Sequence, residues 1–356
     1  MQKRLKYLKI FILYLIFSIF PPFYPLYASQ SLEFIVENET FMKNLEHASI
    51  DEFNEGETFI GDQMKTFFRY IPIKELTIET GAFLGIPFGD SDRVNPKEPV
   101  ISFHLDFGPG MRITARTIER RHPLLEAFFD DDQDYTDPIE QGFQLKGEND
   151  RLRRDLWKSW EEKETDNTPE LFSVGNFIWV SARGVMLEGH IYWVLHGWQK
   201  SEQDMVSNNI SMATGVGYSL YPRKKRKTKF ISEIGATAHY LYNYDNPSGK
   251  NTPTQKNYGV LGKLFMKFSG GEIYYQHWTT KNNGFNPEKG DSLYKAKDYG
   301  EVGLEKTLTL GDGIDLKASF KGQFVGGKFV HIDFLSISWQ GIFSLFEDYF
   351  ERKGGV

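Results

Sequence analysis

The stretch ISFHLDFGPGMRITAR, residues 101–116, alternates apolar and polar side chains on both sides of a Gly-Pro-Gly turn. Ile101 and Phe103 share one face before the turn, and Met111 and Ile113 continue that face after it. Alternation with a period of two is typical of β-strands, and so short a turn joins them in an antiparallel hairpin. Because the opposite face carries charged side chains, the hairpin is predicted to separate an apolar phase from an aqueous one.

The same alternation recurs along the chain in segments of roughly ten residues. These segments are residues 76–86, 101–107, 111–116, 139–147, 151–163, 170–182, 185–199, 209–221, 228–243, 257–268, 271–280, 298–310, 313–325 and 329–341. They predict an all-β fold, an antiparallel transmembrane β-barrel of about fourteen strands, with a range of about twelve to sixteen. Closure into a barrel pairs every backbone N–H and C=O group, which a sheet that crosses a bilayer requires.

The connections between these segments differ in length in a regular way. The short connections are 108–110, 183–184, 269–271 and 311–313, and the long ones are 119–138, 244–256 and 281–297. Bacterial barrels have short periplasmic turns and long outer loops, so the two groups are predicted to lie at opposite ends. The aspartates between Asp130 and Asp137 lack the spacing of a Ca²⁺ loop and are expected to form a solvated acidic loop.

The beginning of the chain has the features of an export signal. An apolar run at residues 10–20 is followed by Pro21 and Pro22, and Ala28 and Ser29 offer a cleavage site. The run is preceded by four cations, Lys3, Arg4, Lys6 and Lys9. Because the run is much shorter than the ~20 residues of a spanning helix, residues 1–29 are predicted to be a signal peptide.

The rest of the chain is predicted to have three parts. Residues 30–56 lack a clean period and are expected to be a periplasmic extension or a luminal plug. Residues 57–341 are assigned to the barrel, and residues 342–356 to a C-terminal tail. The predicted location is the bacterial outer membrane. The expected partners are outer-membrane lipid, lipopolysaccharide and the barrel-assembly machinery, and the sequence leaves the oligomeric state open.

Composition narrows the functional classes. The chain has no cysteine, which excludes disulfides, a lipid-anchoring cysteine and thiolate metal sites. Its formal net charge of −6 argues against a general nucleic-acid binder. Aromatic residues are 15% of the chain, as expected for aromatic girdles at the two membrane interfaces.

Assigning the apolar face outward places charged and histidine side chains on the inner face of the barrel. The candidates to line a solute path are Arg112, Arg116, Arg153, Asp155, Glu188, His190, His196, Glu233 and His239. Both signs of charge are present, which is typical of bracing ion pairs or of a general diffusion pore.

The histidines do not show the spacing of a metal or catalytic motif. His190 and His196 are six residues apart, or about 20 Å along a strand, and cannot share one ion. Pairs such as His104 with Asp106 lack the spacing of a catalytic triad. The sequence therefore predicts no metal, no cofactor and no enzyme activity, with an outer-membrane hydrolase as a minor alternative.

Several phrases resemble a family of uncharacterised bacterial outer-membrane β-barrels of porin-like type. They lie in the middle third of the chain, at residues 121–126, 135–145, 155–160 and 190–199. The sequence departs from that pattern at Trp198 and at the turn after Ser201. The resemblance implies an outer-membrane location and names no substrate.

The leading hypothesis from the sequence is a porin-like channel or transporter for small polar solutes. The first alternative is a closed or plugged, surface-exposed barrel with a binding or structural role. The second is a soluble exported β-sandwich, in which outward residues such as Leu187 and Ile191 would pack against another sheet. A porin-like channel and a closed barrel would differ in single-channel conductance.

Overall fold

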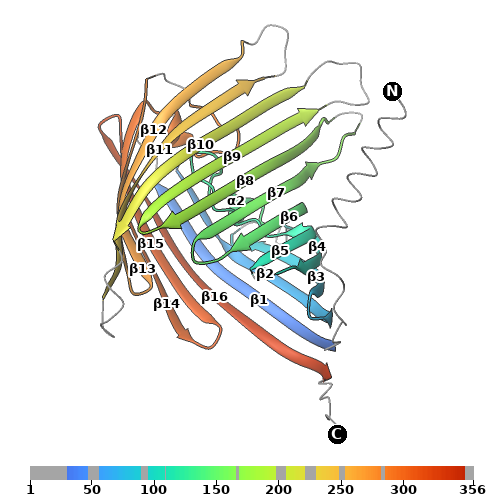
Figure 1. Ribbon diagram of the computed structural model, residues 1–356. Helices are drawn as coiled ribbons and strands as arrows, with labels where there is room; N and C mark the ends of the chain where they lie inside the picture. The colour runs from blue at the N-terminus through green and yellow to red at the C-terminus, as the bar shows by residue number, and fades with distance from the viewer. Residues whose placement is uncertain are drawn as a thin grey trace.

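The computed structural model describes residues 30–46, 56–89, 95–108, 110–165, 168–197, 206–220, 230–247, 253–281 and 285–348. These residues form one closed antiparallel barrel of sixteen strands (Figure 1). Each strand pairs with its neighbours in sequence, and β1 pairs with β16 to close the sheet. The prediction of an antiparallel barrel is confirmed, with the strand number at the upper end of the expected range.

The strands are β1 Gln30–Glu46, β2 Glu57–Ile73, β3 Leu76–Pro87, β4 Asn95–Asp106, β5 Met111–Ile118, β6 Glu140–Glu148, β7 Leu152–Glu162, β8 Glu170–Ala182, β9 Val185–Gly197, β10 Ser207–Leu220, β11 Ile231–Asn246, β12 Gln255–Phe268, β13 Gly271–Thr280, β14 Asp298–Gly311, β15 Ile314–Val325 and β16 Lys328–Asp348. Two short helices, α2 (Gln133–Thr136) and η1 (Ser292–Lys295), lie in connections. Within the described residues, no helix has the length and apolar character needed to cross a membrane.

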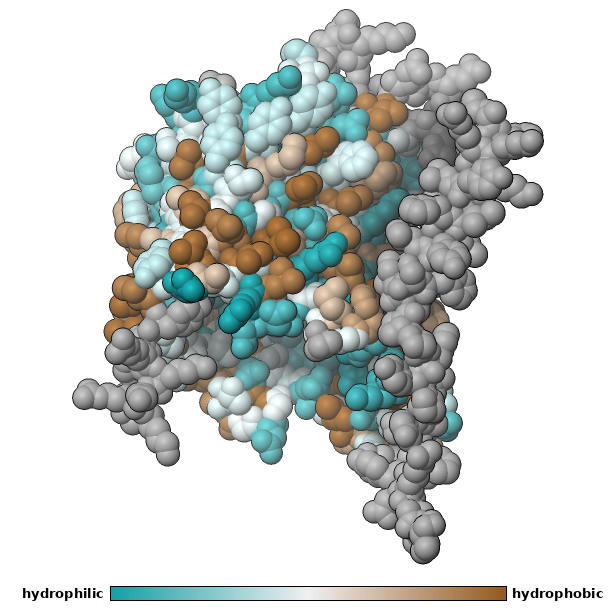
Figure 2. All heavy atoms as spheres, viewed as in Figure 1, coloured by the Kyte–Doolittle hydropathy of each residue, from teal (hydrophilic) through white to brown (hydrophobic). Residues whose placement is uncertain are grey.

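The alternation of each strand places apolar side chains on the outer wall. Leu187 and Ile191 on β9 are 55% and 42% exposed, and hydrophobic residues gather across the middle of the visible wall in Figure 2. All the described strands belong to the one closed sheet, so these side chains pack against no second sheet. The alternative of a soluble sandwich is therefore wrong.

The prediction for residues 30–56 is also wrong, because residues 30–46 form β1 of the wall. The fourteen predicted segments correspond to β3–β16, and β1 and β2 complete the barrel. The alternation of β1 is blurred because its inward side chains include the apolar Ile35, Phe41 and Leu45. Phe41 packs against Tyr135 of the β5–β6 connection, with ring centroids 4.5 Å apart. Residues 47–55 lie outside the described residues.

The last strand is longer than expected. β16 runs to Asp348, whereas the predicted barrel ended at residue 341. Phe343 and Phe346 pair with Phe34 and Leu32 of β1, so this apolar segment belongs to the sheet and not to a tail. The pairing of β1 with β16 shifts in register between Leu32 and Glu33. The signal peptide predicted at 1–29 and residues 349–356 lie outside the described residues.

The connections divide between the two ends as predicted. The short turns that follow β4, β8, β12 and β14 lie at one end, with the start of β1 and the end of β16. The connections 119–139 and 281–297 lie at the other end, after β5 and β13. One turn at that end is short, because Gly326 and Gly327 have φ values of 56° and 79° that few other residues adopt. The end with the short turns is periplasmic by the rule for bacterial barrels.

Candidate functional site

Two of the outer connections fold into the lumen instead of extending from it. We call residues 119–139 and 285–297 together the plug. Phe128 and Phe285 are fully buried, and their rings stack with centroids 6.3 Å apart. The buried residues of the plug share one hydrophobic cluster with inward side chains of the wall, among them Trp157, Tyr192, Leu241, Trp278, Tyr299 and Val330. These wall residues come from six strands between β7 and β16, so the plug fills the lumen on that side of the barrel.

Two lysines of the wall hold the plug by ion pairs. Lys321 on β15 contacts Glu126 at 2.6 Å and Asp131 at 3.1 Å, and its side chain is 7% exposed. Lys43 on β1, 3% exposed, pairs with Asp131 and Asp132. The expectation of a freely solvated acidic loop is therefore wrong. These carboxylates turn inward because the wall offers cations there.

Further polar contacts fix the edges of the plug. Arg121 contacts Glu39 of β1 at 2.8 Å and Asp134 at 3.4 Å. In the second connection, Lys289 pairs with Glu161 of β7 at 2.7 Å. Contacts of this kind on opposite sides of the barrel hold both connections against the wall.

His122 lies in the plug between two buried carboxylates. Its Nδ1 is 2.8 Å from Asp155 of β7 and its Nε2 is 3.0 Å from Glu140 of β6. The imidazole stacks on the indole of Trp157, with centroids 3.5 Å apart and planes 2° from parallel. The indole in turn lies over Gly175, where a Cβ atom would be 2.0 Å from the ring. We call His122, Asp155 and Glu140 the His122 clamp.

The clamp favours the charged form of its imidazole. Burial acts to lower the pKa of His122, but the hydrogen bonds and charges of Asp155 and Glu140 more than offset it, and the pKa is raised. Gln144 also donates to Asp155, at 3.0 Å. An imidazolium between two carboxylates can donate protons or hydrogen bonds, which is the capacity of a general acid or of an oxyanion-stabilising group.

Two cavities lie where the plug leaves space, and one of them borders the clamp at Asp155. One of about 510 Å³ is lined by Asp155, Arg121 and Pro123, together with residues of the periplasmic end. Another of about 630 Å³ runs along the inner face of β1–β5 and reaches Arg120 and Pro138. The clamp therefore adjoins space that could admit part of a ligand.

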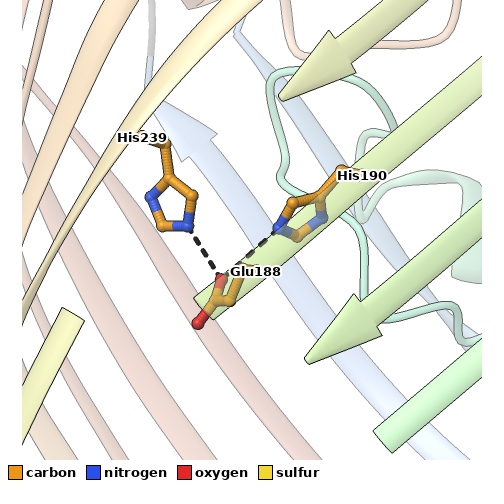
Figure 3. A group of neighbouring side chains, drawn as sticks. All are labelled: Glu188, His190 and His239. Carbon is orange, nitrogen blue, oxygen red and sulfur yellow. Dashed lines mark hydrogen bonds and ion pairs between the residues drawn. The ribbon is translucent and has the colours of Figure 1, made fainter. Parts of the chain in front are cut away.

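A second group of titratable side chains converges on the inner face of β9 and β11, a few strands along the wall from β6 and β7. Glu188 Oε2 is 2.8 Å from His239 Nε2 and 3.4 Å from His190 Nε2. Figure 3 shows both imidazoles directed toward the Glu188 carboxylate. The strand register explains this, because Glu188 on β9 and His239 on β11 are both opposite Gly215 of β10. A Cβ atom at Gly215 would lie 2.2 Å from His239, so only glycine leaves room for the contact. Two imidazoles and one carboxylate are potential ligands for a transition metal.

Comparison with known proteins adds a family to this geometry. Residues 25–320 match the model of a family described as Lipid A 3'-O-deacylase-type. The chain belongs to this family. No curated protein matches the chain.

Solved structures match in fold. One is a loop-deletion mutant of OmpT, an outer-membrane protein of Vibrio cholerae, with a TM-score of 0.51 and 9% identity over 88% of this chain and 99% of the other. Another is an anion-selective porin from Comamonas acidovorans, with a TM-score of 0.50 and 10% identity over 88% and 100%. With the family match, these confirm a porin-like barrel in the bacterial outer membrane.

Membership of a deacylase family corrects one prediction. No histidine pair has the spacing of a catalytic triad, and the chain was expected not to be an enzyme, but a Lipid A 3'-O-deacylase-type family is a family of enzymes. The expectation rested on the spacing of histidines and carboxylates that are close together in the sequence. The partners of His122 lie on two other elements, β6 and β7, and only folding brings them together.

The remaining predicted lumen residues are mostly engaged in ion pairs. Arg112 donates twice to Asp106, at 2.7 and 3.0 Å. Arg153 pairs with Glu148, Glu233 with Lys267, and His196 with Glu288 of the plug. Arg116 is exposed with φ at 78°, and the inward position next to it is taken by Thr117. A role for any of them in a solute path stays a prediction.

The plug should respond to pH through Asp130. Burial, together with the charge of Asp132, raises the pKa of Asp130 to about 7. The stabilisation that protonated Asp130 provides is complete below about pH 4 and is lost as the pH rises to about 7. Calorimetry should therefore show a Tm that falls between about pH 5 and 7, and a smaller fall in Asp130→Asn. Identical pH profiles for the two proteins would refute this assignment.

Proposed function

We propose that this chain is an outer-membrane hydrolase that cleaves an acyl ester of a lipid A-like glycolipid, with the His122 clamp as its catalytic candidate. The family match over residues 25–320 supports the reaction class. The bound carboxylates, the raised pKa of His122 and the adjoining cavities support the location.

The observation that carries the proposal is the low wall beside the clamp. β5 has 8 residues and β6 has 9, whereas β1 and β2 have 17 each. Eight residues at ~3.4 Å each, tilted by about 40°, span about 20 Å, less than the ~25 Å apolar band of an outer-membrane barrel. His122 lies four residues after the end of β5, so a lipid of the outer leaflet would meet the clamp where the rim is lowest.

The clamp supplies the groups that ester hydrolysis needs. Asp155 fixes the imidazole through Nδ1, and the Nε2 side of His122 faces Glu140. We infer that Glu140 turns from His122 toward the cavity when substrate binds and accepts a proton from the attacking water. The freed Nε2–H of His122 then donates to the oxyanion that develops on the ester. When this intermediate collapses, the ester C–O bond breaks, and the leaving sugar oxygen takes the proton that Glu140 accepted from water.

The filled lumen favours a closed barrel over the channel hypothesis. Buried aromatic residues of both connections occupy the lumen, and wall lysines hold one of them in place. An open pore for small polar solutes would need these contacts to break. Lipid and lipopolysaccharide therefore replace small polar solutes as the proposed ligands.

One experiment tests both parts of the proposal. The protein is purified from outer membranes in detergent and checked for heat-modifiable migration. It is then incubated with lipopolysaccharide, and released fatty acid is measured by mass spectrometry. Acyl release by a barrel that gives no stepwise conductance in planar bilayers is expected. Stable conductance without acyl release would overturn the proposal and restore the channel.

A further inference from the structure

We propose that Glu188, His190 and His239 form a binding site for one transition-metal ion of the Zn²⁺ class. The ion would be held by Oε2 of Glu188 and Nε2 of both histidines. This inference does not depend on the proposed hydrolase activity, because the group lies on β9 and β11, apart from the three residues of the His122 clamp.

The distances from the carboxylate oxygen to the two imidazole nitrogens suit such an ion, and all three ligand atoms lie within 4.8 Å of one another. Zn²⁺ binds imidazole nitrogen and carboxylate oxygen at about 2.0–2.2 Å, so tetrahedral ligands are about 3.3–3.5 Å apart. Oε2 of Glu188 is 3.4 Å from Nε2 of His190, which matches this spacing. The distance to Nε2 of His239 is 2.8 Å, and a side-chain shift of about half an ångström would open it to the same value.

The wall fixes these ligands before any ion binds. Glu188 and His190 are two residues apart on β9 and point to the same face. His239 of β11 reaches them across β10, at the position of Gly215. His190 and His239 are 2% and 5% exposed, and their rings are 5.7 Å apart. Ligands on two strands of one closed sheet lose little freedom on binding, which favours affinity.

The chemistry of the group selects the class of ion. Two imidazoles favour Zn²⁺, Cu²⁺ or Ni²⁺ over Mg²⁺ and Ca²⁺, which prefer oxygen ligands. Glu188 has 17% of its side chain exposed, so a water could complete the coordination from the lumen.

Two other groups in the barrel do not offer this arrangement. The nitrogens of His122 contact two different carboxylates and do not converge with another imidazole. Asp130, Asp131 and Asp132 lie close together, but Lys43 and Lys321 already compensate their charge. Among the described residues, the convergence of two imidazoles on one carboxylate is found at Glu188.

The test uses metal binding to the folded barrel. Protein carrying a tag without histidine is extracted from outer membranes, freed of metal by a chelator and titrated with Zn²⁺ by calorimetry. Co²⁺ serves as a spectroscopic probe, because its visible absorption reports four-coordinate binding. One Zn²⁺ per barrel and intense Co²⁺ bands are expected. Absence of saturable binding by the wild-type protein would overturn the proposal.

Variants assign the ligands. His190→Ala and His239→Ala should each weaken Zn²⁺ binding by at least about 30-fold, and Glu188→Gln, which preserves the shape of the side chain, should also weaken it. His277→Ala is the matched control, since His277 is exposed on β13, outside the group. The site would be refuted if Zn²⁺ affinity were unchanged in both His190→Ala and His239→Ala, or if His277→Ala lost as much Zn²⁺ affinity as they do. Heat-modifiable migration of each variant confirms folding.

Discussion

Replacement of His122 by alanine is expected to reduce acyl release at least about 100-fold and to lower the Tm of the barrel. The first effect follows from loss of the proposed proton donor. The second follows because Asp155 and Glu140, each 2% exposed, would be left buried without their shared cation. Removing one partner from a buried ionic group costs about 3–5 kcal/mol. Mass spectrometry of released fatty acid and calorimetry measure the two effects.

A milder variant separates catalysis from folding. Asp155→Asn keeps the size of the side chain and an acceptor for His122, so the barrel should assemble while acyl release falls. His196→Ala is the control, because His196 also joins wall and plug by one ion pair, with Glu288, but lies outside the clamp. A folded His122→Ala protein with wild-type acyl release would exclude the clamp as the catalytic group.

The periodic pattern was sufficient to predict β3–β16, because the outward face of those strands is apolar and most of their charged side chains face inward. It was not sufficient for β1, where Phe41 and Leu45 face inward and are apolar. An apolar inner face makes sense only once the plug is known, since Phe41 packs on Tyr135. The plug was not predicted, because its aspartates resemble a solvated loop in the sequence. Only the fold brings Lys43 and Lys321 into contact with them.

The candidate sites show the same limit. Alternation alone placed Glu188, His190 and His239 on the inner face, and the structure agrees. Their contact depends on the register of three strands and on Gly215, neither of which a single-strand pattern contains. His122 lies in the stretch 121–126 that resembles the outer-membrane family, but it was not predicted as a site residue. Its partners are 18 and 33 residues away in sequence.

Replacement of Lys321 by methionine should loosen the plug and convert a silent barrel into a conducting one. Lys321 is the cation of β15 that pairs with both Glu126 and Asp131. Methionine keeps the apolar stem and removes the charge, which leaves these carboxylates facing an apolar side chain. We expect a cost of about 2–4 kcal/mol, below the full value for a buried pair because Asp131 is 44% exposed. Single-channel recordings in planar bilayers should show stepwise openings.

Lys317→Met is the matched control for this prediction. Lys317 lies on the same face of β15, four residues nearer the periplasmic end, and its ammonium packs over the ring of Phe334 at 5.5 Å. It should therefore leave the bilayer recordings silent. Equal conductance from both variants would mean that the charge of the lumen, and not the attachment of the plug, controls opening. If Lys321→Met stays silent and folded, the aromatic contacts of Phe128 with Phe285 hold the plug without the ion pairs.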